Sequence, residues 1–226
     1  MTNLAKIAFF DFCETLVNFQ TADNFIYYIR KNSKRKRWML VWNYIRIFLV
    51  YTKIIYYLTR IFPKSSIHKR LVLFQLKGYT NIEVDKYAQL YYNKCIRPNL
   101  IEPVIDEMKF LQKEGYRIVI VSGGYDVYLK YFAIEFGIAL KDILSTKIKF
   151  NKKGICCGVF DGIDCLWNNK VLILSKFYKK NSIYSIAFSD SETDLPLLNW
   201  ANKGIVVRRN DIKPWDSKGI FKEIVW

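Results

Sequence analysis

Short apolar runs and longer segments with helical periodicity alternate along most of the chain. The runs lie at residues 7–10, 117–121, 182–188 and 204–207. They are too short for helices and are typical of strands buried on both faces of a sheet. Helical patterns at residues 103–114, 126–136 and 170–179 separate the later runs. Because strands separated by helices form parallel sheets, the pattern predicts an α/β fold with a Rossmann-like, doubly wound sheet.

Two segments depart from this alternation. Residues 143–150 and 155–160 are joined by a polar turn, and this pattern predicts a β-hairpin. Residues 17–103 read as helical throughout. We therefore divide the chain into an α/β core, residues 1–16 and 104–226, and an inserted all-helical cap, residues 17–103.

Two sequence features of the cap predict individual helices. Thr80 and Glu83 have the spacing of a capping box, which predicts a helix start. Residues 38–62, followed by Pro63, are strongly apolar and predict one long helix.

The charges in this long segment limit how it packs. Arg46, Lys53 and Arg60 are seven residues apart and would form one narrow polar stripe on a helix. Three cations within the segment disfavour a membrane-spanning helix. Two interpretations stay open. Either the helix is packed nearly all round, which we favour, or its apolar face lies in a membrane interface beside the basic run at residues 31–37.

The excess of positive charge is concentrated in the cap. The chain has a net charge of +16, and residues 17–103 hold 16 Lys and Arg against 4 Asp and Glu. Such a segment favours an anionic partner, which could be a substrate phosphate, a membrane surface or a nucleic acid. No nucleic-acid-binding motif accompanies the charge, so nucleic acid is the weakest of the three. A general bias toward Lys, Ile, Asn and Tyr is the alternative source of the excess.

Cysteine and histidine usage excludes several kinds of site. Five cysteines at irregular spacing argue against a disulfide framework, and a single histidine without a CxxC pair argues against zinc. One histidine also removes most Ser-His-Asp and Cys-His nucleophile schemes. The first residues lack the pattern of a secretory signal. We expect a cytoplasmic protein, peripheral on the inner face of the membrane if residues 38–62 contact lipid.

Three of the predicted strands end in residues that can carry chemistry. Asp11, Ser122 and Asp190 each follow an apolar run, and the carboxyl ends of parallel strands lie at one sheet edge. Lys170 begins a helix from which its ammonium could reach the same edge. Taken singly, each residue has an ordinary explanation as a turn, a cap or a solvated side chain.

These residues belong to four motifs. In their order along the chain, the motifs resemble those of the haloacid dehalogenase superfamily, in the branch that includes phosphoserine phosphatase-like enzymes. They are FFDFCETL at residues 9–16, VIVSGG at 119–124, NNK at 168–170 and FSDSETDLPLL at 188–198. The helical insertion between the first two motifs matches the cap position of that branch. The resemblance covers nearly the whole chain and implies a phosphomonoester hydrolase with a Mg²⁺ cofactor.

The resemblance also implies a role for each site residue. Asp11 would attack phosphorus and form a phospho-aspartate. Asp11, Asp190 and the backbone carbonyl of Cys13 would bind Mg²⁺, which prefers oxygen ligands. Ser122, the backbone at Gly123 and Lys170 would bind the transferring phosphoryl group. Asp194 belongs to the metal site by resemblance and would orient Lys170 or the water molecules on the metal.

Cys13 departs from the family pattern, which places a second aspartate there as general acid and base. A thiol with an ordinary pKa of about 8.5 is mostly protonated near neutral pH and is a poor base toward water. Glu14 also replaces a common glycine. The substrate would be a small phosphorylated metabolite or sugar, or a lipid phosphate as in some members with apolar caps. The alternative function is a phosphotransferase or a catalytically impaired binding protein.

Overall fold

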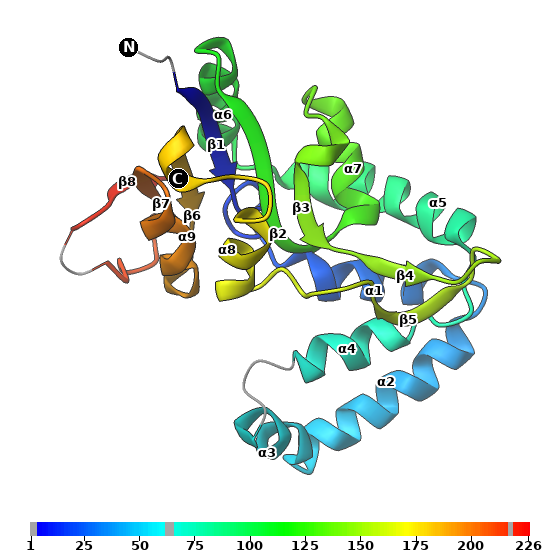
Figure 1. Ribbon diagram of the computed structural model, residues 1–226. Coiled ribbons are helices and arrows are strands. Elements are labelled where there is room, and N and C mark those ends of the chain that lie inside the picture. Colours follow the sequence, from blue (N-terminus) through cyan, green and yellow to red (C-terminus); the bar gives the residue numbers. More distant parts are fainter. Residues whose placement is uncertain (1–3, 62–65, 217–218) are drawn as a thin grey trace.

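The computed structural model describes residues 4–61, 66–216 and 219–226, which are organised around one parallel sheet (Figure 1). Its six strands have the order β3-β2-β1-β6-β7-β8 and all neighbours run parallel. They are β1 (Ala5–Phe10), β2 (Arg117–Tyr125), β3 (Ile143–Thr146), β6 (Ile183–Ser189), β7 (Lys203–Arg208) and β8 (Lys222–Val225). The predicted α/β class with a Rossmann-like sheet is confirmed.

Alternate residues of the central strands face two different cores. In β1, Ile7 and Phe9 pack with the buried faces of α8 (Asn168–Leu174) and α9 (Leu195–Trp200). Ala8 and Phe10 belong to the opposite core, which α6 (Glu102–Lys113) and α7 (Asp126–Glu135) cover. Because side chains alternate along a strand, one continuous apolar run supplies both layers.

The described residues of the helical insertion between β1 and α6 form five α-helices, and some of these residues share the core of α6 and α7. The helices are α1 (Thr21–Asn32), α2 (Lys36–Tyr51), α3 (Ile54–Ile61), α4 (Ile67–Phe74) and α5 (Asn81–Tyr91), followed by a π-helical turn at Tyr92–Ile96 and a 3₁₀ turn at Arg97–Asn99. Phe25 of α1 and Tyr91 of α5 are fully buried in this core. The predicted capping box is confirmed, since Thr80 and Glu83 satisfy one another's backbone N–H groups.

The prediction of one packed helix over residues 38–62 is wrong on two counts. The helix breaks at Thr52–Lys53, where Lys53 adopts a left-handed φ of +58°, so the three cations do not form a single stripe. Burial is also limited: Met39, Asn43 and Ile55 are buried, whereas most other described side chains of the segment are exposed. The predicted end at Pro63 lies outside the described residues.

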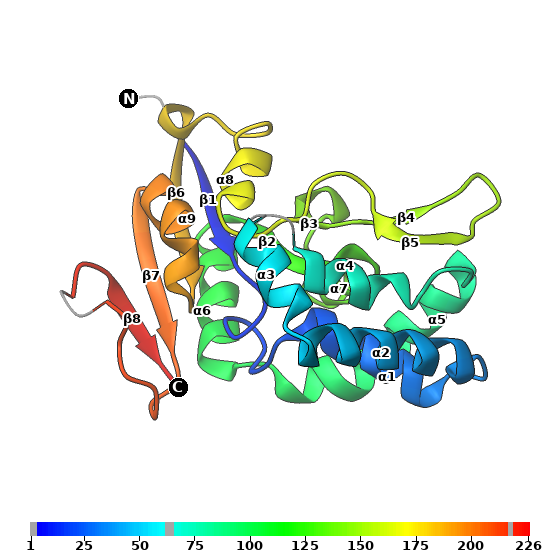
Figure 2. The same cartoon turned by 90° about the horizontal axis from the view of Figure 1, so that it is seen from below.

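The predicted hairpin of residues 143–150 and 155–160 is confirmed only in part, because just the second half of its first strand takes part in the pairing. Residues 143–146 form β3, the edge strand of the main sheet, so only β4 (Ile148–Phe150) pairs with β5 (Cys156–Phe160). This hairpin lies beside α4 and α5 (Figure 2) and joins the cap through the Cys156 N–H, which donates to the carbonyl of Tyr79 at 2.7 Å. None of the helices within the described residues is long and apolar enough to cross a membrane.

Candidate functional site

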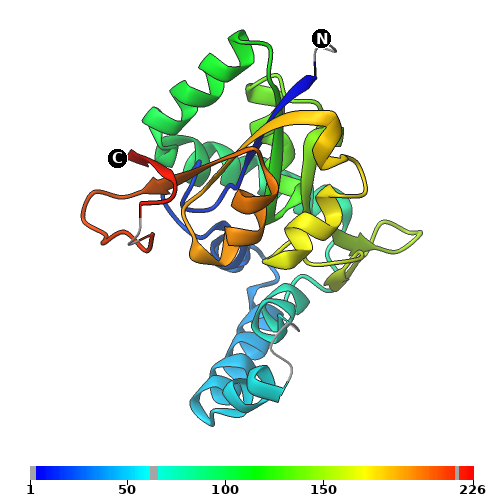
Figure 3. The ribbon, with the colours of Figure 1, turned by 60° about the vertical axis from the view of Figure 1, so that its left-hand side comes forward.

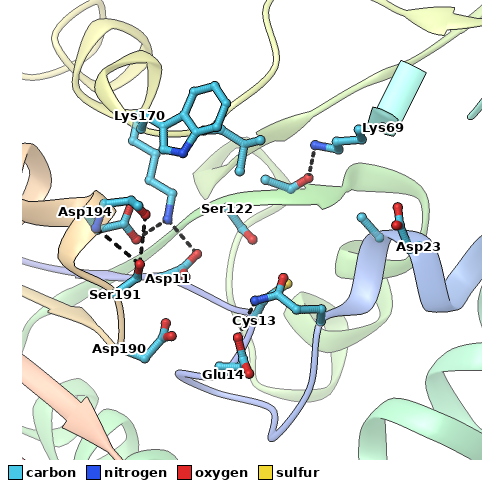
Figure 4. A pocket seen from close by; sticks show the side chains of 16 residues that line it. Asp11, Cys13, Glu14, Asp23, Lys69, Ser122, Lys170, Asp190, Ser191 and Asp194 are labelled. Atoms are coloured by element: carbon cyan, nitrogen blue, oxygen red, sulfur yellow. Dashed lines mark hydrogen bonds and ion pairs between the residues drawn. The ribbon is translucent and has the colours of Figure 1, made fainter. Parts of the chain in front are cut away.

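A pocket of about 310 Å³ opens at the carboxyl edge of the sheet (Figure 4). β1 lies between β2 and β6 in register, with Phe10 opposite both Ile120 and Phe188. The next residues along these three strands therefore reach the same edge. The structure brings all seven predicted site residues to this edge: Asp11, Cys13, Ser122, Gly123, Lys170, Asp190 and Asp194 all line the pocket.

Lys170 is buried between two carboxylates. Its Nζ lies 2.8 Å from Asp11 Oδ1 and 2.5 Å from Asp194 Oδ2. Burial alone would lower the pKa of Lys170, but the two carboxylates outweigh it and the pKa is raised, so the ammonium stays charged. Ser189 also donates to Asp194 Oδ2, at 2.7 Å. Asp194 thus orients Lys170, the first of the two roles that its motif implied.

Asp11 and Asp190 form a close pair of carboxylates with too little positive charge beside it. Burial raises the pKa of both, and the charge of Asp11 raises that of Asp190 further. Lys170 compensates Asp11, whereas no salt bridge among the described residues involves Asp190. Asp190 Oδ1 accepts a hydrogen bond from Thr15 at 3.0 Å. Desolvated carboxylates of this kind are stabilised by a cation.

The donor set fits Mg²⁺ better than a softer metal. Within the described residues no cluster of three or more His, Cys, Asp or Glu side chains is arranged to hold a metal. Two carboxylates, however, suffice for Mg²⁺, because this ion keeps several waters and accepts backbone carbonyl ligands. Asp11, Asp190 and the carbonyl of Cys13 are the residues that would hold it.

The motif after β2 supplies a tight backbone turn. Ser122 is fully buried, and its Oγ accepts a hydrogen bond from the Gly124 N–H at 3.0 Å. A Cβ at Gly123 would lie 2.3 Å from Leu166 Cδ2, so the position has no room for a side chain. Gly123 lines the pocket, so the turn places backbone groups at the pocket wall, where small anions can be bound.

Cys13 is held by the first residue of α1, Thr21. Its Sγ lies 3.0 Å from Thr21 Oγ1, which in turn lies 2.7 Å from the hydroxyl of Tyr128. Burial, followed by the negative charge of Asp11, raises the pKa of the Cys13 thiol to about 11. At neutral pH the group is therefore a thiol rather than a thiolate, which sharpens the contrast with the aspartate of the family pattern.

The backbone conformation of Glu14 explains why glycine is common at this position. It adopts a left-handed φ of +57°, which strains any residue with a Cβ. Its carboxylate accepts a hydrogen bond from the side chain of Gln20. Glu14 is thus turned toward the first residues of the cap rather than toward Asp11 (Figure 4).

Lys69 and Asp164 form a second buried ion pair at the pocket, which the sequence did not predict. Lys69 of α4 donates to the Gly123 carbonyl at 2.5 Å and to Thr146 Oγ1 at 3.1 Å. Asp164 accepts from Thr146 at 2.7 Å, while its Oδ2 is buried without a partner. Lys69 therefore fastens the cap to the edge of the sheet directly behind Gly123.

No local motif marks this pair, because the two residues are 95 positions apart in the sequence. Asp23 of α1 also lines the pocket from the cap side and lies 3.5 Å from His68 Nδ1. His68, whose other ring nitrogen lies 2.9 Å from Arg46 Nη1, therefore connects α1 to α2 beside the pocket. The cap thus adds groups of both signs to the pocket wall.

These features define the class of protein. It is an α/β protein whose parallel sheet carries a lysine-bridged acidic site at its carboxyl edge, beneath a helical cap. The chain belongs to the haloacid dehalogenase-like hydrolase family, whose model matches residues 8–199. The predicted resemblance to this superfamily is confirmed.

Individual relatives are distant. Protein CicA of Caulobacter vibrioides (strain NA1000 / CB15N) is 24% identical over 129 residues, and the match spans 57% of each chain. A protein of unknown function from Bordetella pertussis Tohama I has a TM-score of 0.76 at 16% identity and is covered over 99% of its chain and 98% of this one.

A phosphoserine phosphatase structure, described as a phospho-aspartyl intermediate analogue, has a TM-score of 0.58 at 22% identity and is covered over 87% of its chain and 91% of this one. At these identities the solved structures show the fold.

Proposed function

We propose that this protein is a Mg²⁺-dependent phosphomonoester hydrolase that works through a phospho-aspartate on Asp11. The observation that carries the proposal is the buried group formed by Lys170, Asp11 and Asp194 beside the carboxylate of Asp190. A nucleophilic carboxylate, a fixed ammonium and a second carboxylate for a cation are what phosphoryl transfer requires. The phospho-aspartyl analogue formed by a protein of the same fold supports this assignment.

In the first step, an oxygen of the Asp11 carboxylate attacks phosphorus, the bond from phosphorus to the ester oxygen breaks, and the leaving alkoxide takes up a proton from water. Lys170 contacts Asp11 and can follow the charge that develops on the phosphoryl oxygens. The Ser122 hydroxyl and the backbone at Gly123 line the same wall and would hold those oxygens. Asp11, Asp190 and the Cys13 carbonyl would hold Mg²⁺, which would supply the positive charge that an anionic carboxylate needs to approach an anionic phosphate.

In the second step, water attacks the phosphorus of the phospho-aspartate and the bond to the Asp11 oxygen breaks. The attacking water must lose a proton, and general-base help at this stage is worth about 10²–10⁴-fold. Cys13 stands where that base belongs, but its buried thiol holds its own proton at neutral pH. We infer that hydrolysis of the phosphoenzyme is the slow step.

The same observation favours a second candidate function. A site that forms a phospho-aspartate and releases it slowly suits a phosphotransferase, and one that does not form it suits a phosphate-binding protein. Both candidates rest on the thiol of Cys13. They differ from the hydrolase in the lifetime of the phosphoenzyme, which can be measured.

The cap would select the substrate. Lys69 and Asp23 bring one positive and one negative group to the cap side of the pocket, beside Trp167. A small phosphorylated metabolite or sugar, or the headgroup of a lipid phosphate, would meet these residues once its phosphate lies between Ser122 and Lys170.

The test is a panel of phosphoserine, sugar phosphates, lipid phosphates and nucleotides, assayed with Mg²⁺ for released phosphate. p-Nitrophenyl phosphate is added because its leaving group needs no proton. We expect turnover that Asp11→Asn and EDTA both abolish. Asp106→Asn, an exposed change on α6, is the matched control and should leave the rate unchanged. Full activity of Asp11→Asn, or no effect of EDTA, would contradict the mechanism.

A phosphate analogue separates the remaining candidates. If no substrate of the panel is turned over, beryllium trifluoride with Mg²⁺ should still raise the melting temperature of a protein that forms a phospho-aspartate, because a ligand bound to the native state stabilises it. No stabilisation, together with no labelled phosphoenzyme after acid quenching, would contradict both the hydrolase and the phosphotransferase.

A further inference from the structure

Exposed apolar side chains are concentrated on the outward side of α2 and α3. Residues 38–61 hold 14 of the 27 exposed large hydrophobic residues within the described chain. Six of them, each more than half exposed, are Val41, Tyr44, Phe48, Tyr51, Tyr57 and Ile61, and Tyr51 is 85% exposed. We call these six residues the α2–α3 surface. Contiguous exposed apolar surface of this kind marks an interaction site.

The surface has a definite direction. Val41, Tyr44, Phe48 and Tyr51 are spaced by three, four and three residues, so they lie along one face of α2. The opposite face is the one that packs inward, through Met39, which accepts a hydrogen bond from the buried Tyr79 hydroxyl at 3.3 Å. α2 and α3 project from the rest of the molecule (Figures 1 and 3), so the outward face meets no other element of the described chain.

The part of the sequence that contains this surface carries only positively charged side chains over a long stretch. Between Asp23 and Glu83 the sequence contains 13 Lys and Arg and no Asp or Glu. Several of these cations are used inside the cap, as Arg46 is by His68 and Asn43. Lys31, Lys34, Lys53 and Arg60 are exposed. Aromatic and aliphatic side chains on one face of a helix, beside exposed cations, fit the interface of an anionic bilayer.

We propose that the α2–α3 surface docks on an anionic lipid bilayer, with the aromatic side chains at the level of the headgroups and the neighbouring cations on the lipid phosphates. A second copy of the chain fits less well, because two such surfaces face to face would bring together two regions that carry only positive charge. The docking is independent of the proposed catalytic activity, since none of its residues lines the pocket.

The docked surface is connected to the pocket by α4. This helix follows α3 in the chain and packs against α1 and the β4–β5 hairpin, and its Lys69 reaches the Gly123 carbonyl. A protein docked in this way would keep the cap wall of its pocket near the bilayer. Phosphate esters carried by lipids could then enter between cap and core, which is a consequence of docking and not its basis.

Vesicle sedimentation tests the proposal with the full-length protein. The probe is vesicles of equimolar phosphatidylcholine and phosphatidylglycerol, with pure phosphatidylcholine as the comparison. We expect binding to the anionic vesicles at low salt, weaker binding at high salt because exposed charges are screened, and little binding to the neutral ones. Equal binding to both kinds of vesicle, or none to the anionic kind at low salt, would overturn the proposal.

A matched pair of double variants tests the surface itself. Phe48→Ser with Tyr51→Ser removes two apolar side chains from the α2–α3 surface and should weaken vesicle binding about tenfold or more, because both side chains would otherwise be buried in the bilayer interface. Phe110→Ser with Phe177→Ser removes two similarly exposed aromatic side chains from the core and should leave binding unchanged. Equal losses in the two variants would show that the surface is not specific.

A second pair tests the charges. Lys53→Glu with Arg60→Glu should weaken binding to the anionic vesicles and flatten its salt dependence, whereas Lys152→Glu with Lys179→Glu should not. Sedimentation equilibrium without lipid distinguishes the competing occupant. If the native protein is a dimer that Phe48→Ser with Tyr51→Ser converts to a monomer, and neither protein binds vesicles, the surface is a contact between copies and the proposal fails. The catalytic assay of Asp11→Asn is a separate measurement, so neither failure can be mistaken for the other.

Discussion

Charged side chains are buried at the carboxyl edge of the sheet, whereas apolar side chains are exposed on the α2–α3 surface. At the edge, Lys170 is 2% exposed and Asp194 is 3% exposed. On the surface, Phe48 is 62% exposed and Tyr44 is 66% exposed. Both arrangements are unfavourable for a chain that only needs to fold, since buried charges lose hydration and exposed apolar groups order water.

The two regions differ in how the unfavourable arrangement is compensated. At the sheet edge most of the compensation lies within the protein, where Lys170, Asp11, Asp194 and Ser189 satisfy one another. On the α2–α3 surface no described residue covers the outward face. The comparison teaches that the pocket is largely formed in advance, whereas the cap surface depends on a partner. Cys13 connects the pocket to the cap but not to this surface, because it lines the pocket and its Sγ lies 3.0 Å from Oγ1 of Thr21 in α1.

The largest effect should come from removing the cation at the sheet edge. Lys170→Met leaves two buried carboxylates without their partner, which typically costs about 3–5 kcal/mol of unfolding free energy. The loss should shrink as the pH falls, because burial raises the pKa of Asp11, which can then take up a proton in the native state that the unfolded chain binds less readily. Urea unfolding of the metal-free protein at several pH values measures both.

Lys176→Met is the matched control, since Lys176 is exposed in the turn that follows the same helix. It should change the unfolding free energy by less than about 0.5 kcal/mol. If Lys170→Met were no more destabilising than Lys176→Met, the edge would not be the internally compensated site described above.

The next effect in size concerns Cys13, where pocket and cap meet. With p-nitrophenyl phosphate the native enzyme should release one burst of nitrophenol and then turn over slowly, with phosphate trapped on Asp11. Cys13→Asp should supply the missing acid and base and raise the steady-state rate tenfold or more, within the usual contribution of about 10²–10⁴-fold. Stopped-flow absorbance resolves the burst, and acid quenching quantifies the phosphoenzyme.

Cys13→Ala separates the roles of the thiol. An unchanged rate would mean that the thiol takes no part in catalysis. Another group, such as Glu14, would then have to accept the proton of the attacking water. The unfolding free energy of the Cys13→Asp variant should also be measured, to check that the contact with Thr21 is retained. If the cap repacked, the rate would fall for a different reason. A native enzyme without a burst, combined with no gain from Cys13→Asp, rules out slow hydrolysis of the phosphoenzyme.

Much of the core and of its site could be predicted from the sequence. The apolar runs fix the strands, and a parallel sheet brings the residues that follow them to one edge, so Asp11, Ser122 and Asp190 could be placed together without coordinates. Lys170 could be expected at the same edge, because it begins a helix there, whereas its contact with Asp11 comes from the structure. β8 was missed because Lys222–Val225 is short and largely exposed, which leaves little periodicity to detect.

The cap could be predicted less well, and for physical reasons. The break at Lys53 carries no glycine or proline, so nothing in the sequence announces the left-handed residue. Apolar composition predicted burial, but composition does not say whether a helix finds a partner within its own chain. The ion pair of Lys69 and Asp164 depends on how α4 lies over the sheet, and that depends on long-range packing rather than on a local motif.

The smallest effect should come from the α2–α3 surface in the absence of lipid. Phe48→Ser removes an aromatic side chain that contacts mainly water, so it should change the unfolding free energy by less than about 0.5 kcal/mol. Met39→Ala, on the inward face of the same helix, removes a fully buried side chain and should cost about 2–5 kcal/mol. The pair holds helix and neighbourhood constant and changes only the direction in which the side chain points. Urea unfolding of both variants without vesicles measures the difference. A large loss for Phe48→Ser would mean that the outward face is already covered in solution, by another part of the chain or by a second copy, and the contrast between the two regions would disappear.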